Sequence, residues 1–217
     1  MHQPAGTLIP ATPHLYLAFN SATRIALADP NTGNHTMALT ATIYKAGLSI
    51  SDMDRSYYAS HNLTLAQHPS ETVERLMVRL VAFILNASET LSFTRGLSAD
   101  DEAELWQKNY SDEIELWIEL GEPDEKRLKK ACSRADKVVL YSYGGRSSEV
   151  WWPQIENKLL KLDKLSVYRI STATQAELAG LCQRSMQLTA TIQDGQLWLA
   201  DETRNVLVEV EALKVPH

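Results

Sequence analysis

The side chains of this sequence that could do chemistry are mainly carboxylates, and some of them are spaced so that they could meet at one edge of a sheet. Glu119 lies near the end of the apolar segment 114–120, and α/β folds place their sites at the carboxyl ends of such strands. Glu74 lies in the first turn of a predicted helix, roughly 60° from the centre of its apolar stripe. Asp101 lies in an acidic run just before another predicted strand. A few carboxylates completed by water are the ligands that Mg²⁺ or Mn²⁺ prefers.

Each of these carboxylates also has a purely structural explanation, which the sequence leaves open. Glu119 could end a strand in solvent, and the run around Asp101 could be a solvated turn. Glu71 and Glu74 are favoured in a first helical turn by the helix dipole alone. The carboxylates therefore indicate a site only if the fold brings them together.

Other catalytic signatures are missing from the sequence. It contains no GxGxxG, no Walker A loop, no GxSxG and no HExxH motif. Of the six histidines, only His61 and His68 fall in the predicted folded part ahead of the C-terminus, which argues against a histidine-based triad or zinc site. Cys132 and Cys182 lie far apart without metal-ligand spacing, and we expect both to be reduced and buried.

The composition is that of one globular domain, with 217 residues of which 44% are hydrophobic and 22% charged. No stretch approaches the roughly 18 apolar residues of a membrane span, and no positive cluster precedes the short apolar segment 15–19. We therefore expect a cytoplasmic protein without membrane contact, a monomer or weak oligomer, whose protein partner the sequence does not identify. The formal net charge of −6 means that any surface for nucleic acid must be local.

The chain divides near Met37. Residues 1–36 contain four prolines and neither helical nor strand periodicity, so we predict a disordered leader. Strand-like alternation starts abruptly in 38–44, which suggests that Met37 could be the true translation start. The folded domain is predicted to cover residues 37–217.

The predicted fold is a single α/β (α+β) domain with one mixed central sheet flanked by helices and extended by β-strands from both ends of the domain. A strand at 62–66 is expected to return antiparallel to the first, and Ser70 is expected to cap the strongest helix. Asp194-Gly195 is a hairpin signal. The apolar stripe of the strongest helix consists of Val73, Leu76, Met77, Leu80, Val81 and Ile84. Further strands are predicted at 91–94, 104–107, 114–120, 138–141, 165–170 and 206–210, and further helices from Pro123 and at 154–162 and 174–185.

Several longer blocks of sequence are spread over the predicted domain, at 37–39, 41–45, 68–72, 93–97, 99–102, 116–121, 123–125, 129–132, 151–152 and 190–195. Through these blocks the chain resembles the YaeQ family over essentially all of residues 37–217. That family looks like a variant of the PD-(D/E)xK nuclease fold, whose αβββαβ core matches the element order predicted here for residues 70–141. The resemblance implies that Glu74, Asp101 and Glu119 hold a divalent metal, Mg²⁺ or Mn²⁺, beside the scissile phosphate of a nucleic acid.

Two positions depart from the nuclease pattern. No proline precedes Asp101, and Gly121 stands where the motif has its lysine. Hydrolysis would therefore need another residue in place of that lysine. Lys129 on the following helix is the candidate, and Lys129 and Glu119 are the two predicted catalytic residues. Lys129 could equally be a solvated charge near a helix C-terminus.

A possible nucleic-acid contact follows the last core strand. The segment 143–148 is expected to be a flexible loop that offers Arg146 to a phosphate, and Trp151 could stack on a base. Tryptophans in such a position are more often core, so at least one of Trp151 and Trp152 is expected to be buried against the sheet.

Two hypotheses from different classes follow. The first is a divalent-metal-dependent phosphodiesterase or endonuclease that acts on nucleic acid. The second is a non-catalytic regulatory or binding module that kept the nuclease-like scaffold and contacts nucleic acid or a protein partner. The fold alone does not choose between them.

Overall fold

The computed structural model describes residues 40–96 and 101–216, which form two sheets and four helices. The predicted leader 1–36 and residues 38 and 39 of the first predicted strand lie outside the described residues. In chain order the elements are β1 (Thr42–Asp52), β2 (Tyr57–Gln67), α1 (Val73–Leu85), β3 (Leu91–Phe93), β4 (Leu105–Lys108), β5 (Ile114–Leu120), α2 (Glu125–Arg134), β6 (Ala135–Tyr143), α3 (Arg146–Leu159), β7 (Leu165–Ile170), α4 (Thr172–Ala179), β8 (Ser185–Gln193), β9 (Gln196–Ala200), β10 (Asn205–Val208) and β11 (Val210–Lys214).

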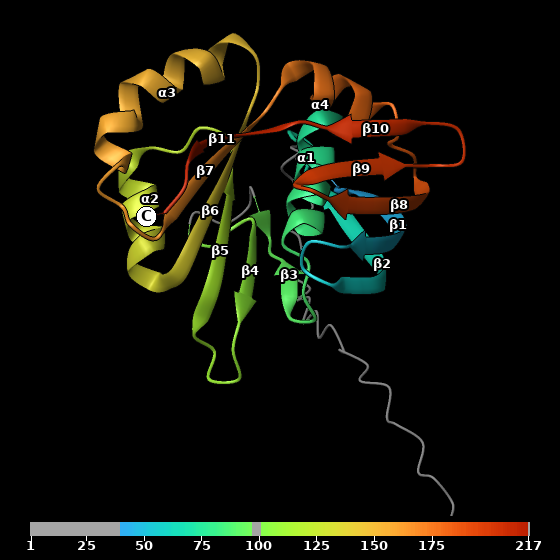
Figure 1. Ribbon diagram of the computed structural model, residues 1–217, viewed down its shortest axis with the longest axis horizontal. Helices are drawn as coiled ribbons and strands as arrows, with labels where there is room; N and C mark the ends of the chain where they lie inside the picture. The colour runs from blue at the N-terminus through green and yellow to red at the C-terminus, as the bar shows by residue number, and fades with distance from the viewer. Residues whose placement is uncertain (1–39, 97–100, 217) are drawn as a thin grey trace, which may run out of the picture. The chain divides into compact units, whose positions relative to one another are not determined.

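The elements form alternating layers. A five-stranded sheet has the order β10-β9-β8-β1-β2, and a six-stranded sheet has the order β11-β7-β6-β5-β4-β3. In Figure 1, α1 lies between the sheets with α4 beside it, while α2 and α3 cover the other side of the six-stranded sheet. Two apolar clusters correspond to these interfaces, one around α1 and one around α2 and α3. We call the two sides of the six-stranded sheet its α1 face and its α2 face.

The mixed α/β class and the mixed sheet flanked by helices are confirmed, but the sequence did not predict that the structure has two sheets. The extra strands from the two ends of the domain form a sheet of their own, because β1 pairs antiparallel with β2 and parallel with β8. The predicted hairpin is confirmed, with Asp194 and Gly195 at φ of 52° and 74° between β8 and β9. A second sheet is what allows α1 to be covered on both sides.

Helix α1 is the centre of the fold. Its predicted stripe is confirmed except that Val73 is half-buried, and from Arg75 onward the positions between the stripe residues are buried as well, since sheets cover both sides. The helix starts later than expected, because the Thr72 hydroxyl and not that of Ser70 accepts the Arg75 backbone N–H, at 3.2 Å. At its C-terminal end, Arg55 Nη2 donates to the Ile84 carbonyl at 3.4 Å, and Arg55 Nη1 donates to the carbonyl of Ala87, just past the helix, at 3.1 Å.

The predicted order of core elements from α1 to β6 is confirmed. Strands β3, β4 and β5 run antiparallel to one another, and α2 returns the chain so that β6 lies parallel to β5. The register places Leu105 opposite Ile118, so Glu104 lies at the start of β4 next to the end of β5. Two of the carboxylates predicted from sequence, Asp101 before β4 and Glu119 near the end of β5, therefore belong to segments at one end of this part of the sheet.

Two helices differ from the sequence prediction. Helix α3 begins at Arg146 and contains Pro153, so the second half of the expected loop 143–148 is helical, while α4 ends at Ala179 instead of continuing to residue 185. Trp152 is buried against the sheet, as expected for one of the two tryptophans. Cys132 and Cys182 are free thiols but half-buried. Among the described residues, no helix is long and apolar enough to cross a membrane.

The corrected cap gives a testable prediction. Thr72→Ala removes the hydroxyl that accepts the Arg75 N–H and should lower the free energy of unfolding by about 1 kcal/mol. Ser70→Ala, which alters only an exposed hydroxyl bonded to His68, should change it by less than about 0.5 kcal/mol. Urea unfolding of both variants measures the difference. A larger loss of unfolding free energy in Ser70→Ala would identify Ser70, as predicted from sequence, as the N-cap.

Candidate functional site

The end of β5 holds Glu119 in a closed environment. Glu119 is 2% exposed, and its Oε1 accepts hydrogen bonds from Trp117 Nε1 at 2.6 Å and from Arg127 Nε at 3.0 Å. Burial raises the pKa of Glu119, and the Trp117 N–H and the Arg127 guanidinium oppose that rise. The solvated strand end that the sequence left open is thus wrong for this residue.

Arg127 connects Glu119 to the segment before β4. The residue lies in the first turn of α2, where the Asp124 carboxylate accepts its backbone N–H at 2.8 Å. Its Nε bonds Glu119, and its Nη2 donates to the Glu102 carbonyl at 2.9 Å. A guanidinium therefore occupies the place between Glu119 and residues 101–102 where the nuclease resemblance expects a cation.

The other two predicted ligands face solvent. The Asp101 side chain is 80% exposed and is paired with Lys130, and the Asp101 carbonyl accepts from Arg134 at 2.9 Å. Glu74 is exposed in the first turn of α1. Among the described residues, no three His, Cys, Asp or Glu side chains are grouped so that they could hold a metal ion. The predicted ligands are therefore not assembled into a site.

A second charged group lies on the α1 face and was not predicted. Glu71 pairs with Arg75 at 2.7 Å and with Arg79 at 3.0 Å, and Arg75 also pairs with Glu104. All of these side chains are buried. We call Glu71, Arg75, Arg79 and Glu104 the α1 ion network. The sequence signal for it was the i, i+4, i+8 spacing of Glu71, Arg75 and Arg79 at and just before an apolar helix.

Glu104 is one of two members of the α1 ion network with a buried, unpartnered atom among the described residues, the other being Arg79 through its Nε. The Oε1 of Glu104 bonds Arg75, but its Oε2 is buried and has no hydrogen-bond partner among the described residues. A Cβ at Gly96, which adopts φ of +53°, would stand 2.9 Å from that oxygen. Glycine at 96 therefore leaves this oxygen uncrowded, while the Cβ of most other residues would press against it.

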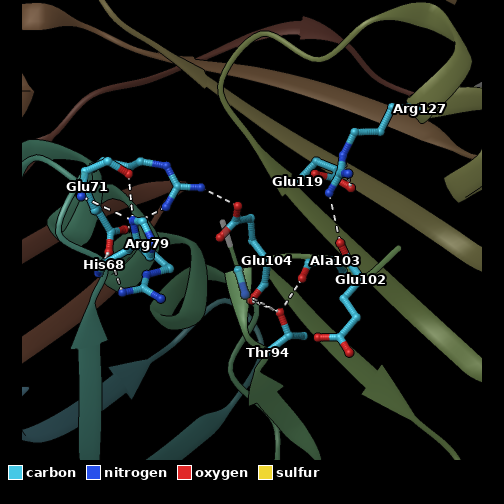
Figure 2. Close-up of polar contacts among 12 residues, drawn as sticks. His68, Glu71, Arg79, Thr94, Glu102, Ala103, Glu104, Glu119 and Arg127 are labelled. Carbon is cyan, nitrogen blue, oxygen red and sulfur yellow. Dashed lines mark hydrogen bonds and ion pairs between the residues drawn. The ribbon is translucent and has the colours of Figure 1, made fainter. Parts of the chain in front are cut away.

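The α1 ion network and the Glu119–Arg127 pair lie on opposite faces of the six-stranded sheet. Successive strand residues alternate between faces, so Glu119 shares the α2 face with Trp117, whereas Ile118 and Leu120 pack on the α1 face. Figure 2 shows Glu119 and Arg127 well separated from Glu71 and Arg79, with the Glu104 carboxylate turned toward the latter group. The nearest buried carboxylates are thus divided by the sheet itself.

The remaining predicted residues lie on the α2 face. Lys129 is exposed and pairs with Glu125 at 2.5 Å, so Lys130, and not Lys129, reaches the predicted ligand Asp101. Arg146 is the exposed first residue of α3. Trp151 is half-buried, with its ring centroid 6.0 Å from that of Trp152. Lys129, Arg146 and Trp151 therefore belong to the helical surface beside the Glu119–Arg127 pair.

Comparison with known proteins shows a close relationship to one family. The family model described as YaeQ protein matches residues 37–210. The proteins called "Uncharacterized protein YaeQ" of Escherichia coli (strain K12) and Salmonella typhi are each 48% identical over 180 residues, which is 83% of this chain and 99% of theirs.

Solved structures extend this similarity to the fold. The crystal structure of the YaeQ protein from Xanthomonas axonopodis pv. citri has a TM-score of 0.79 at 46% identity and covers 82% of this chain and all of its own. That of the Pseudomonas syringae YaeQ protein has a TM-score of 0.77 at 33% identity and covers 81% of this chain and 97% of its own.

The α1 ion network predicts a large stability effect. Glu71→Gln leaves Arg75 and Arg79 buried with fewer counter-charges, so the free energy of unfolding should fall by about 3–5 kcal/mol. Glu74→Gln, an exposed change one turn away, should have almost no effect. Urea unfolding of the two variants tests this, and equal losses would mean that the network does not hold α1.

Glu119 predicts a pH dependence. Because burial raises its pKa in the folded state, Glu119 contributes most stability below its ordinary value of 4.5 and loses that contribution as pH rises through the raised value. The stability of the wild-type chain relative to Glu119→Gln should therefore fall as pH rises from about 4.5 and then level off.

Denaturant unfolding across this pH range measures the difference, with Glu177→Gln on the exposed side of α4 as the control. If the stability difference between the wild-type chain and Glu119→Gln does not change with pH, the ion pair with Arg127 offsets the effect of burial on the pKa of Glu119.

Proposed function

This chain belongs to the YaeQ family, and we propose that it is a non-catalytic module that binds nucleic acid through the exposed side of α2 and α3. The observation on which this rests is the position of Arg127, whose guanidinium bridges the Glu119 carboxylate and the Glu102 carbonyl. A built-in side-chain cation there removes the need for a divalent ion. The available donors do not fit Mg²⁺ or Mn²⁺, because one carboxylate is held by Arg127 and the other two predicted ligands face solvent.

The local charge of α2 and α3 supports a polyanionic partner. Residues 125–164 contain ten Lys and Arg and five Asp and Glu, although the whole chain has 21 basic and 27 acidic residues. The two helices pack side by side, and Lys158 of α3 lies 3.9 Å from Glu125 of α2. The exposed basic side chains of this surface are Lys126, Lys129, Lys130, Arg134, Arg146 and Lys158. Such a local basic surface is the electrostatic feature that phosphate backbones recognise.

Trp151 adds a second recognition element to the basic surface. It is half-buried on α3, between the exposed Val150 and the buried Trp152. An aromatic ring beside basic groups provides a stacking platform for an unpaired base. Single-stranded DNA or RNA is therefore the form of nucleic acid that this surface fits best.

A second candidate function is the metal-dependent phosphodiesterase that the resemblance to PD-(D/E)xK nucleases implies, with Glu74, Asp101 and Glu119 as metal ligands and Lys129 assisting. The observation in its favour is the buried, unpartnered Oε2 of Glu104 under Gly96, which would accept a cation or a water ligand. The separation of Glu104 and Glu119 by the sheet counts against a shared metal.

Fluorescence anisotropy with labelled single-stranded DNA and RNA at about 50 mM salt tests the proposal on the full chain. Lys126→Glu with Lys158→Glu should weaken binding at least about tenfold and lower the salt slope by about one for each lost phosphate contact. The control is Lys45→Glu, because Lys45 lies on the far side of the five-stranded sheet and donates to Thr64. Equal loss in the control and the α2–α3 variant, or no binding by the wild-type chain, would reject the surface.

The same samples incubated with Mg²⁺ or Mn²⁺ separate the two functions. The binding module should leave the DNA and RNA intact. Cleavage that requires the metal and disappears in both Asp101→Asn and Glu119→Gln would replace the proposal by the phosphodiesterase. Cleavage that survives both substitutions would identify a contaminating nuclease and leave the binding result to decide.

A further inference from the structure

A cavity of about 270 Å³ lies past the C-terminal end of α1, where the two sheets face each other directly. Its walls from the six-stranded sheet include Val139, Tyr141 and Tyr168, and its walls from the five-stranded sheet include Leu197 and Val208. Asn86, the C-cap of α1, lines it as well. A concave space in which apolar side chains surround a few convergent polar groups is the usual form of a small-molecule site, and this cavity combines both kinds of lining.

Tyr141 is the polar group inside the cavity. Asn86 Nδ2 donates one hydrogen bond to the Ala82 carbonyl at 2.9 Å and the other to the Tyr141 hydroxyl oxygen at 2.7 Å. Both amide protons of Asn86 are thereby used, so the Tyr141 oxygen is an acceptor in this bond. Among the described residues, no acceptor receives the hydroxyl proton of Tyr141. Burial raises the pKa of Tyr141 above its ordinary value, so that proton is present at neutral pH.

Lys137 brings a positive charge to the rim of the cavity, and two stacked tyrosine rings form part of its wall. Lys137 shares the strand β6 and the face of Tyr141, four residues away, and its side chain is exposed at the edge of the cavity. The rings of Tyr141 and Tyr168 stack with centroids 5.6 Å apart and planes at 23°. A planar apolar body would fit against these rings, with a negative group at Lys137 and an acceptor at Tyr141.

We propose that this cavity binds a small aromatic carboxylate, with its carboxylate at Lys137, its ring beside Tyr168, and an acceptor oxygen at its far end on the Tyr141 hydroxyl. The cavity is small compared with typical ligand sites of roughly 300–1,000 Å³, which limits the ligand to about one ring with short substituents. The site is lined from β6, β7 and the five-stranded sheet, away from the α2–α3 surface. Ligand binding in this cavity can therefore be tested independently of nucleic-acid binding.

The test uses three probes that differ by one group each. 4-Hydroxybenzoate has the charge, the ring and the distal oxygen, benzoate lacks the distal oxygen, and 4-hydroxybenzamide lacks the charge. Titration of the isotope-labelled full chain should give amide shift changes centred on Gly195, Leu197 and Tyr168, which line the cavity. 4-Hydroxybenzoate should bind about fivefold tighter than either of the others, since each missing group removes one ion pair or hydrogen bond.

Two variants assign these differences to their side chains. In Lys137→Gln the preference for 4-hydroxybenzoate over 4-hydroxybenzamide should disappear, and in Tyr141→Phe the preference over benzoate should disappear, each without loss of the other preference. Lys45→Gln and Tyr110→Phe are matched controls, because both residues are exposed and lie outside the cavity. Neither control should alter the order of the probes.

The titration results either support or overturn the proposed ligand site in the cavity. Shift changes at the cavity with the expected order and its selective loss in the two variants support the site. Absence of shifts at about 10 mM probe, where even a millimolar site would be mostly filled, would overturn it. So would shifts that centre on another surface, or an equal response to all three probes. If Tyr141→Phe unfolds, Lys137→Gln with the three probes still decides the charge contact.

Discussion

Arg75 and Arg79 lie in a helix that is covered by a sheet on each side, and the fold must neutralise them there. A buried charge without a partner costs several kcal/mol, so the positions of Glu71 and Glu104 follow from the burial of these arginines. Glu71 reaches both guanidiniums from the segment just before α1, and Glu104 reaches Arg75 from the start of β4. The network thus ties the central helix to the sheet whose edge is the candidate site.

This pairing also decides what the carboxylates can do. A carboxylate that neutralises a buried guanidinium is a poorer ligand for a second cation, since both cations would compete for the same oxygens. Glu71 uses both of its oxygens in this way, and Glu119 has Trp117 and Arg127. Among the carboxylates that the structure describes, Glu104 alone keeps a buried oxygen without a partner. Most of the buried carboxylate oxygens at this end of the sheet are therefore already paired with arginine side chains.

Much of the fold could be predicted from local pattern. The order of elements from α1 to β6, the β8–β9 hairpin and the bounds of β7 and β5 follow from periodicity and turn chemistry, which are local properties of the chain. The second sheet could not be predicted, because the parallel pairing of β1 with β8 joins segments at opposite ends of the domain. The start of α3 was missed because Gly144 and Gly145 indicate a loop, although the helix begins at the next residue.

The candidate site was predicted less well, for a reason that lies in the period of a strand. Sequence placed Glu119 at the correct end of β5 but did not fix its face, and helical position favoured Glu74 when the buried acid was Glu71. Side chains in a strand alternate, so bringing Glu119 to the α1 face would require β5 to shift by one residue against its neighbours. That shift would also move Trp117 out of the α2 cluster and turn Ile118 away from α1. The apolar residues on either side of Glu119 thus hold its carboxylate beside Arg127 and apart from Glu104, and a change of rotamer cannot reverse this.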